Sequence, residues 1–327
     1  MIECRGLPVE AGCHSGTFGV TTEAIRRAIV DLQMGRRVAL RRTGTRPEIV
    51  RHPDTAPSSR PHVSVIVPAY NYARYLTACV ESIVSQPGVT VDVLVIDDCS
   101  TDETPSVTAA LAQRHRCVRV IRHEHNRGHI DTYNEGLLQI DAPYSVLMDA
   151  DDILPSGALA RATALLEAHP EVGFAYGRPV HFIDEPPARF EHRGRVRSWS
   201  VWSGHDWIAR CCSHGYNVVS NPEVVMRTEV MRDCGGFKRE LPHTGDLELW
   251  LQLAARADVG RVNGPAQGYY RVHATSMQRT IYKGVLVDLQ GRRDAFEYVF
   301  SGPAKTYPDS DELHSTARRA LASQALD

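Results

Sequence analysis

The sequence has no long hydrophobic run and almost no net charge. No apolar stretch reaches the ~18 residues that a membrane-spanning helix needs. The first residues include Glu3 and have no apolar core, so we expect no secretory leader. The formal net charge is -2 over 327 residues, which gives no overall attraction to nucleic acid or to an anionic membrane. We therefore expect a cytoplasmic protein without a nucleic-acid partner or a transmembrane segment.

The sequence also has no Cys-x-x-Cys pair among its eight cysteines. Most of these cysteines lie inside apolar segments. This distribution favours reduced thiols over disulfides or a zinc site of standard spacing.

Short β-branched runs alternate with amphipathic segments in the first half of the chain. The expected strands are 63–70, 91–97, 118–123 and 144–149, and the expected helices between them are 73–86, 102–115 and 128–140. Continuous apolar strands that alternate with helices predict an α/β fold with a mostly parallel central sheet and helices on both faces. Such sheets bind ligands at the carboxyl ends of their strands.

The second half is less regular. Its expected strands are 172–183, 223–227 and 268–273, and its expected helices are 156–168, 204–212 and 244–257. Residues 184–200 are polar and irregular. Beyond residue 279 we expect helix, with a weakly structured tail after Gly302. Residues 1–61 resemble an appendage, with helical periodicity at 21–40 and a proline-rich linker at 46–62.

Three carboxylates follow the apolar run at 144–147. They are Asp149, Asp151 and Asp152. Like charges this close repel one another unless a cation compensates, and Mg²⁺ or Mn²⁺ favours an Asp-x-Asp pair completed by waters and substrate phosphates. A solvated turn, in which Asp152 caps the next helix, is the alternative. These residues alone leave both interpretations open, with Asp152 as a second metal contact or as that cap.

Two more acids lie at the end of the strand 91–97. Asp97 and Asp98 either belong to an ordinary strand–turn–helix connection or accept a hydrogen bond from a base or ribose. Asp246 lies in the first turn of a predicted helix with Thr244 as candidate cap, where the helix dipole keeps an acid ionised and available as a base. It could equally be a structural helix-start carboxylate.

The last candidate residue is His273, directly after the final predicted strand. It is either a metal ligand or a structural histidine.

The order and spacing of six motifs closely resemble the family-2 glycosyltransferases with the GT-A fold. The motifs are VSVIVPAYN (63–71), VIDDCSTDET (95–104), NRGHIDTYNEGL (126–137), LMDADD (147–152), TGDLELWLQL (244–253) and YRVH (270–273). The resemblance covers residues 63 to about 275. It implies a nucleotide-binding half at 62–155 and an acceptor half at 156–278, which together form one domain at 62–278. We expect a helical N-terminal extension with linker at 1–61 and a C-terminal helical tail at 279–327.

The resemblance implies that the first two motifs hold the nucleotide base. Pro68, Ala69 and Tyr70 would line the base pocket. Asp98 would accept a hydrogen bond from the base, with Asp97 beside it.

Two further motifs would surround the rest of the nucleotide. Asn126 and Gly128 match the family's Asn-x-Gly turn, and Arg127 between them would help to neutralise the diphosphate. Asp149 would lie near the ribose, with Ala150 next to it.

The remaining implied roles concern the reaction itself. Asp151 and His273 would hold Mn²⁺ or Mg²⁺, which neutralises charge on the departing diphosphate. Asp246 would be the catalytic base that takes the proton from an acceptor hydroxyl. The implied activity is an inverting, metal-dependent transfer of one hexosyl or N-acetylhexosaminyl group by single displacement. The donor is a nucleoside-diphosphate sugar, most commonly a UDP-sugar.

Two departures from the family pattern narrow this expectation. Gly245 precedes Asp246 where many members have glutamate, and the Gln-x-x-Arg-Trp motif of processive synthases is absent. We therefore expect single transfers, to an acceptor glycan, a lipid-linked sugar or a small natural product. A homo-oligomer could form through the N-terminal extension or the C-terminal tail.

Two alternative functions stay open at this point. One is a sugar nucleotidyltransferase, although VPAYNYARY is not the Gly-rich basic loop with which that class usually begins. The other is a non-catalytic nucleotide-sugar or glycan-binding protein.

Overall fold

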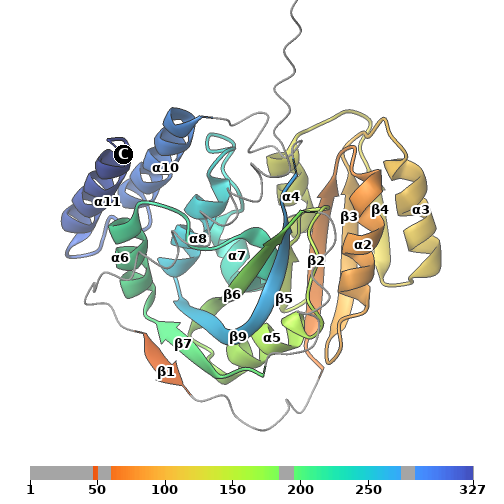
Figure 1. The fold of residues 1–327 in the computed structure, drawn as a ribbon, viewed down its shortest axis with the longest axis horizontal. Coiled ribbons are helices and arrows are strands. Elements are labelled where there is room, and N and C mark those ends of the chain that lie inside the picture. Colours follow the sequence, from red (N-terminus) through yellow and green to blue (C-terminus); the bar gives the residue numbers. More distant parts are fainter. Residues whose placement is uncertain (1–46, 51–59, 184–194, 274–283, 327) are drawn as a thin grey trace, which may run out of the picture.

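The computed structural model describes residues 47–50, 60–183, 195–273 and 284–326. Within these ranges the strands form a single nine-stranded sheet with the order β1–β7–β9–β6–β8–β5–β2–β3–β4. Helices cover both of its faces (Figure 1). The predicted helix at 21–40 lies outside the described residues.

The first half of the sheet consists of parallel strands, as predicted. The strands are β2 (His62–Ala69), β3 (Thr90–Asp97), β4 (Val118–Arg122) and β5 (Tyr144–Leu147), and the connecting helices are α2 (Ala73–Val84), α3 (Thr104–Arg114) and α4 (His129–Leu138). Successive β2 residues point to opposite faces, so Ile66 joins one hydrophobic cluster while Val65 and Val67 join the other. Because both faces are buried, the strand is apolar at nearly every position.

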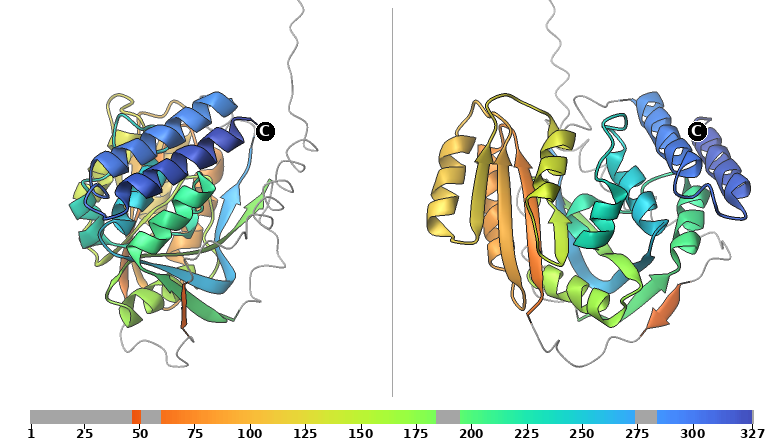
Figure 2. Two further views of the ribbon diagram at one scale, coloured as in Figure 1. Left: turned by 90° about the vertical axis from the view of Figure 1, so that its left-hand side faces the viewer. Right: turned by 180° about the vertical axis from the view of Figure 1, so that it is seen from behind.

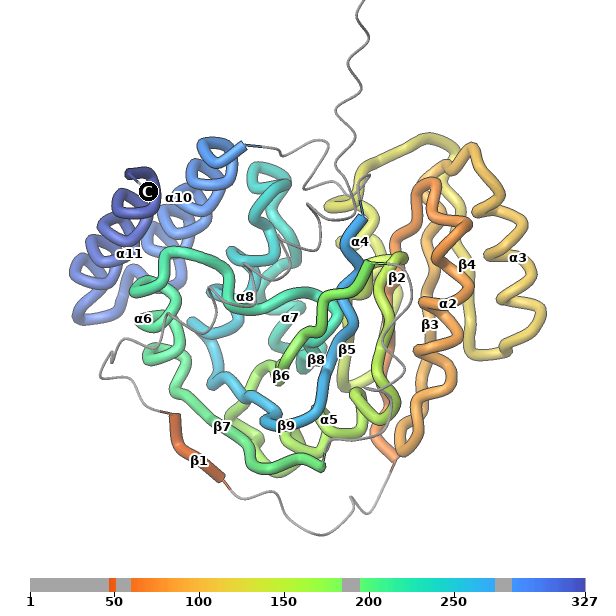
Figure 3. Tube along the Cα trace, in the orientation of Figure 1, coloured from red at the N-terminus to blue at the C-terminus, as the bar shows by residue number. Residues whose placement is uncertain are grey.

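The second half mixes parallel and antiparallel pairs. Its strands are β1 (Glu48–Val50), β6 (Val172–Phe182), β7 (Ser198–Trp202), β8 (Val225–Arg227) and β9 (Asp258–Arg271), and its helical segments are α5 (Ala158–Ala168), α6 (Gly204–His214), the 3₁₀ turn η2 (Asn221–Glu223), α7 (Thr228–Cys234) and α8 (Gly245–Ala254). β6 and β9 run side by side in parallel (Figure 3). The other contacts in this half, β1–β7, β7–β9, β6–β8 and β8–β5, are antiparallel.

The predicted α/β class with helices on both faces and a mostly parallel sheet is therefore confirmed, because of the nine described strands only β7 and β8 run against the others. The parallel prediction came from the apolar runs of the first half, which continue in parallel order. The short strands β7 and β8 reverse direction, and their five and three residues carry little periodic signal.

Each face of the sheet has its own hydrophobic cluster. One cluster joins the sheet to α2, α3 and α5, with Leu76, Leu111 and Leu165 among its members. The other joins it to α4, α6, α7 and α8, with Trp207 and Trp250 fully buried. The two remaining helices, α10 (Val285–Ser301) and α11 (Ser310–Gln324), extend the second cluster outward (Figure 2).

Three sequence expectations need correction. The segment expected to be irregular, 184–200, ends with the first three residues of β7, of which Trp199 and Ser200 are buried. The strand expected at 268–273 begins ten residues earlier, at Asp258. The tail after Gly302 is not weakly structured, because α11 follows and buries three of its residues, Leu313, Ala317 and Leu321, against the rest of the chain.

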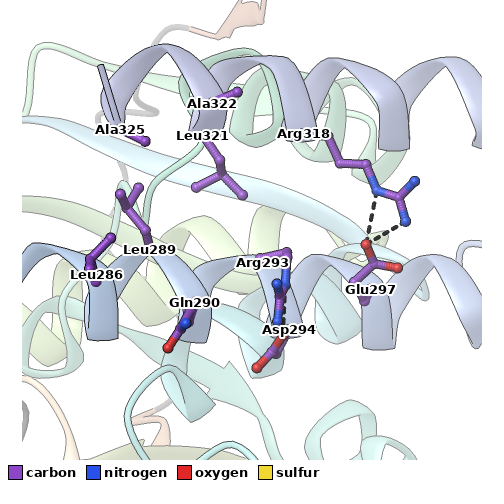
Figure 4. Close-up of a pocket in the computed structure, with 10 residues that line it drawn as sticks. All are labelled: Leu286, Leu289, Gln290, Arg293, Asp294, Glu297, Arg318, Leu321, Ala322 and Ala325. Atoms are coloured by element: carbon purple, nitrogen blue, oxygen red, sulfur yellow. Dashed lines mark hydrogen bonds and ion pairs between the residues drawn. The ribbon is translucent and has the colours of Figure 1, made fainter. Parts of the chain in front are cut away.

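The C-terminal helices α10 and α11 pack against each other and leave a groove between them. Its floor includes Leu289 and Leu321, and an ion pair between Arg318 and Glu297 crosses it (Figure 4). Across the described ranges, no helix is both long enough and apolar enough to span a bilayer.

Candidate active site

The loops that follow β2 and β3 are tied together at the carboxyl edge of the sheet. The side-chain oxygen of Asn71 accepts hydrogen bonds from the backbone N–H groups of Thr101 at 2.8 Å and Asp102 at 3.3 Å, and its own N–H donates to Ser100 Oγ at 2.9 Å. Asn71 and Cys99 both have the left-handed backbone, with φ of 60° and 64°. Non-glycine residues in that region are strained and persist only where surrounding contacts hold them. The two loops therefore form one fixed unit.

The residues expected to line the base pocket lie on this unit. Pro68 and Ala69 end β2, and the ring of Tyr70 follows with 45% of the residue exposed. Tyr70 is thus available to a ligand, while Ala69 is buried.

Asp97 and Asp98 have different structural roles. Asp97 is fully buried; one carboxylate oxygen accepts the N–H of Ser100 at 3.0 Å, and the other lies 3.3 Å from Arg122 Nε. Asp98 accepts the backbone N–H groups of Arg127 and Gly128, each at 2.8 Å. Burial by itself would raise the pKa of Asp98, but these bonds and that from His123 bring its pKa below the usual value.

The predicted Asn-x-Gly turn is built around Asp98. The side-chain oxygen of Asn126 also accepts the N–H of Gly128, at 3.1 Å. Gly128 has φ of 83°, a conformation that favours glycine, and it begins α4. The side chain of Arg127 pairs with Glu135 at 2.7 Å. The structure thus brings Asp98, Asn126, Arg127 and Gly128 together, as predicted.

A histidine that sequence reasoning did not identify completes this cluster. His123 Nδ1 lies 2.7 Å from Asp98 Oδ1, and its Nε2 lies 3.1 Å from Glu135 Oε2. The ring therefore bridges the two carboxylates, one through each nitrogen. Only 1% of the His123 side chain is exposed.

Asp149 lies at the end of the neighbouring strand β5. Its oxygens accept hydrogen bonds from Tyr133 Oη at 2.7 Å and Asn221 Nδ2 at 3.5 Å. Burial, followed by the charge of Asp151, raises the pKa of Asp149 to about 6. Ala150, next to it, is buried. Like charges and burial therefore make this strand end a place where an added positive charge would be stabilised.

Asp151 lies next to His273, which follows the end of β9. Asp151 Oδ2 lies 2.7 Å from His273 Nε2. The guanidinium of Arg271 donates to the backbone oxygen of Asp151 at 2.8 Å and lies over the ring of Tyr75, 4.7 Å from its centroid. The distant β9 is thereby joined to the acids that follow β5.

Asp152 is not the cap of the next helix. Its Oδ1 accepts the N–H of Arg271 at 2.7 Å, and the cap position of α5 belongs to Gly157. Asp152 Oδ2 is buried and has no hydrogen-bond partner within the described part of the chain. Burial and then the charge of Asp151 raise the pKa of Asp152.

These residues fit a divalent cation that is held partly by substrate. Carboxylate oxygens and an imidazole nitrogen are suitable ligands, and Asp151 and His273 already lie at contact distance. Among the described residues, no cluster of three or more His, Cys, Asp or Glu side chains is arranged to hold an ion by itself. That arrangement is expected where phosphate oxygens and waters complete the shell.

Asp246 lies in the first turn of α8. One oxygen accepts the N–H of Leu247 at 2.8 Å and the other accepts Asn217 Nδ2 at 2.8 Å. Burial raises the pKa of Asp246, and the bond from Leu247 and the nearby His243 act against this rise. The charge of Asp246 in turn raises the pKa of Asp149, so the two carboxylates lie within electrostatic range of each other.

The start of α8 is braced by the C-terminal helix α10. The sequence suggested that the side chain of Thr244 caps α8, but it makes no such hydrogen bond. Its hydroxyl instead donates to the backbone oxygen of Gly291 at 2.8 Å. His243 Nε2 lies 3.2 Å from Asp288 Oδ1. The position of Asp246 therefore depends on a helix that lies outside the six motifs.

Sequence reasoning missed the residues that hold the expected ones in place. They are Asn71, Tyr75, His123, Tyr133, Asn217, Asn221 and Arg271. Asn71, Tyr133 and Arg271 lie inside the quoted motifs and could have been singled out. The others lie between motifs, where no pattern marked them.

Comparisons with known proteins find relatives in sequence and in fold. A sequence model of the family described as Glycosyl transferase family 2 matches residues 64–232. A Haemophilus influenzae protein described as an uncharacterized glycosyltransferase is 28% identical over 198 residues, which are 59% of this chain and 60% of that protein.

Two solved structures share the fold. S. aureus TarS in complex with UDP-GlcNAc has a TM-score of 0.60 and 19% identity, over 80% of this chain and 71% of that one. A mannosyltransferase from Pyrobaculum calidifontis, in complex with GDP-Man and Mn²⁺, has a TM-score of 0.52 and 20% identity, over 93% and 87%. At such identities the likeness shows the fold alone.

Proposed function

Because the chain belongs to glycosyltransferase family 2 and has a GT-A fold, we propose that it moves one sugar from a nucleoside-diphosphate sugar to an acceptor hydroxyl, with inversion. The observation that carries this proposal is the placement of Asp246. It is a part-buried carboxylate at a helix start, and its charge acts on Asp149 at the end of β5. A donor at the carboxyl edge of the sheet would then lie between the strand-end acids and this base.

The donor site would be formed by the loops around Asp98. Tyr70 offers an exposed ring beside the base pocket, and the turn at Asn126 and Gly128 is held rigid by Asp98. Arg127 supplies a positive charge at the edge of this site. A fixed site of this kind lowers the entropy cost of holding the donor in the reacting geometry.

Asp246 would act as general base. It would accept the proton of the acceptor hydroxyl as that oxygen attacks the anomeric carbon and the bond to the diphosphate breaks. Its raised pKa makes it a better proton acceptor than a solvent-exposed aspartate. Since attack and departure occur in one displacement, no protein nucleophile is required and the anomeric centre inverts.

Asp151 and His273 would hold the divalent ion, which when bound supplies positive charge to the diphosphate. Asp149 would lie near the ribose, where Tyr133 and Asn221 fix its orientation.

We propose a UDP-sugar as donor, an expectation supported by the UDP-GlcNAc in the TarS complex; the GDP-Man in the other neighbour makes a GDP-sugar the alternative. The acceptor would be a glycan, a lipid-linked sugar or a small natural product, modified once. Three expectations remain predictions. They are the domain boundaries at residues 61, 155 and 278, a cytoplasmic location, and self-association through the N-terminal extension or C-terminal helices.

The test is a panel of nucleoside-diphosphate sugars with Mn²⁺ or Mg²⁺, in which release of nucleoside diphosphate and product stereochemistry are measured. Asp246→Asn should lower kcat by about 10²–10⁴-fold, the range expected for loss of a general base. The matched control is Asp311→Asn, the same change in the first turn of α11, which should leave kcat unchanged. Full activity of Asp246→Asn would contradict the proposal.

Release of pyrophosphate from a nucleoside triphosphate and a sugar phosphate would instead indicate a nucleotidyltransferase, and donor binding without turnover would indicate a binding protein.

A further inference from the structure

The amide of Asn217 has only one orientation that satisfies its contacts. Its side-chain oxygen accepts the backbone N–H of Val219 at 3.1 Å. An amide oxygen accepts and an amide nitrogen donates, so this bond directs the NH₂ group away from Val219. That NH₂ group donates to Asp246 Oδ2 at 2.8 Å. Both ends of the amide are therefore fixed.

The second oxygen of Asp246 is fixed as well. Oδ1 accepts the backbone N–H of Leu247 at 2.8 Å, so the plane of the carboxylate is set by two donors from different parts of the chain. Leu247 belongs to α8, whereas Asn217 belongs to the segment between α6 and η2. Without Asn217, only the hydrogen bond from the N–H of Leu247 to Oδ1 would limit rotation of the Asp246 carboxylate.

The same segment also reaches the acids at the end of β5. Asn221, four residues after Asn217, directs its Nδ2 toward Asp149 Oδ2 at 3.5 Å. The segment 217–221 thus contacts both carboxylates that face the proposed reaction space. It lies outside all six sequence motifs.

Several charged or titratable groups surround Asp246 besides Asn217. His243 precedes α8 and pairs with Asp288 of α10, while Asp149 follows β5 and Tyr270 lies on β9. His243 favours the ionised form of Asp246, whereas the charge of Asp246 disfavours the ionised form of Asp149 by like-charge repulsion. Among these neighbours, Asn217 is the neutral donor that bonds directly to the carboxylate.

We propose that Asn217 is the positioning residue for the general base, since its locked amide holds the Asp246 carboxylate in the orientation that receives the acceptor proton. This inference rests on the proposed function. It has two consequences. Loss of the donor should lower kcat and leave the donor KM nearly unchanged, because the amide contacts the base and not the nucleotide turn. It should also move the acidic limb of the kcat–pH profile to higher pH, because a hydrogen bond that favours the ionised carboxylate is gone.

The experiment compares Asn217→Ala with the wild-type protein in steady-state kinetics across a pH series. We expect a kcat that is about 10- to 100-fold lower at neutral pH, the usual cost of misplacing a catalytic group. Asn217→Gln, which keeps the amide on a longer side chain, should recover part of kcat and move the limb back toward the wild-type pH. If Asn217→Ala does not fold, Asn217→Gln and Asn217→Ser carry the same comparison.

The matched control is Asn263→Ala. Asn263 is also a part-buried amide, and its Nδ2 donates to Ser200 Oγ at 2.9 Å in the sheet, away from Asp246. This variant should lose stability without any movement of the pH limb.

The outcomes separate the two claims. If Asp246→Asn keeps full activity, the proposed function fails. If Asp246→Asn is inactive but Asn217→Ala keeps the wild-type kcat and pH limb, the proposed function stands and the role of Asn217 is refuted. A fall in kcat without movement of the limb, matched by Asn263→Ala, would show a merely structural effect and would also overturn the inference.

Discussion

Replacement of His123 by leucine should destabilise the protein and weaken donor binding. The His123 ring bridges two carboxylates in the interior, with Asp98 Oδ1 at 2.7 Å and Glu135 Oε2 at 3.1 Å. Leucine fills similar space but removes both contacts. Asp98 would then be a buried carboxylate without its histidine neighbour, although it would keep the N–H groups of Arg127 and Gly128.

The size of the loss follows from the burial of each contact. A hydrogen bond to a charged group contributes about 1.5–3 kcal/mol, and breaking a buried ion pair costs about 3–5 kcal/mol. The Asp98 side chain is 5% exposed, so its bond should count nearly in full, but that of Glu135 is 27% exposed and keeps a bond from Arg127. We therefore expect a loss of about 3 kcal/mol, at the lower end of the buried-pair range.

The assay is equilibrium unfolding in urea at neutral pH. The matched control is His115→Leu, because His115 also faces a carboxylate, Glu81 at 3.0 Å, but both partners are partly exposed. That pair should contribute less than about 1 kcal/mol. In kinetic assays, His123→Leu should raise the donor KM more than it lowers kcat, because Asp98 holds the turn and Asp246 lies elsewhere.

The pH dependence gives a second check with a defined sign. The pKa of Asp98 is lowered in the folded protein, so its contribution to stability is fully present above the unfolded value, near 3.8, and is lost as the pH falls through the folded value. His123→Leu removes part of the cause of that lowering, so it should reduce the acid-dependent loss of stability below pH 4. If both histidine variants lost the same small free energy and had the same acid profile, the stabilising role given to the His123–Asp98 contact would be refuted.

Two further predictions concern packing and the metal. Gly204→Ala should cost about 3 kcal/mol or more, because the added Cβ would overlap the backbone oxygen of Ala254, whereas Gly302→Ala, with a nearest contact of 3.2 Å, should cost far less; equal melting temperatures would contradict this account. UDP should raise the melting temperature only when Mn²⁺ or Mg²⁺ is present, and Asp151→Asn should abolish that increase. Stabilisation by UDP that survives chelation would argue against a shared metal.

The first half of the fold was predictable because its signals are local. In β2 and β3 nearly every residue is buried on one face or the other, so each strand stands out as an apolar run between helices. The ligand edge followed from the same pattern, since the carboxyl ends of parallel strands meet. Asp98 and Asp149 were predicted to lie at that edge, and the structure places both there.

The second half was less predictable because its strands depend on distant partners. β7 was missed because it has only five residues and directly follows a polar segment, yet Ser200 and Trp199 are both buried once β1 and β9 pair with it. The start of β9 was missed for a related reason: Gly260, Gly264 and the polar residues around them break the apolar pattern. β6 and β7 pair with this segment on either side and supply the hydrogen bonds that make it a strand.

The C-terminal helices show how far such non-local contacts reach into the site. The sequence places Asp246 at a helix start. Nothing near this position indicates that Thr244 donates a hydrogen bond to Gly291, which lies 47 residues after Thr244. Helix α10 also places Asp288 beside His243, and Phe296 in the core against α8. The segment treated as a tail therefore supports the end of α8 that carries the proposed base. We therefore expect removal of α10 to lower activity through the position of Asp246, because Thr244 and His243 at the start of α8 would lose their contacts with Gly291 and Asp288.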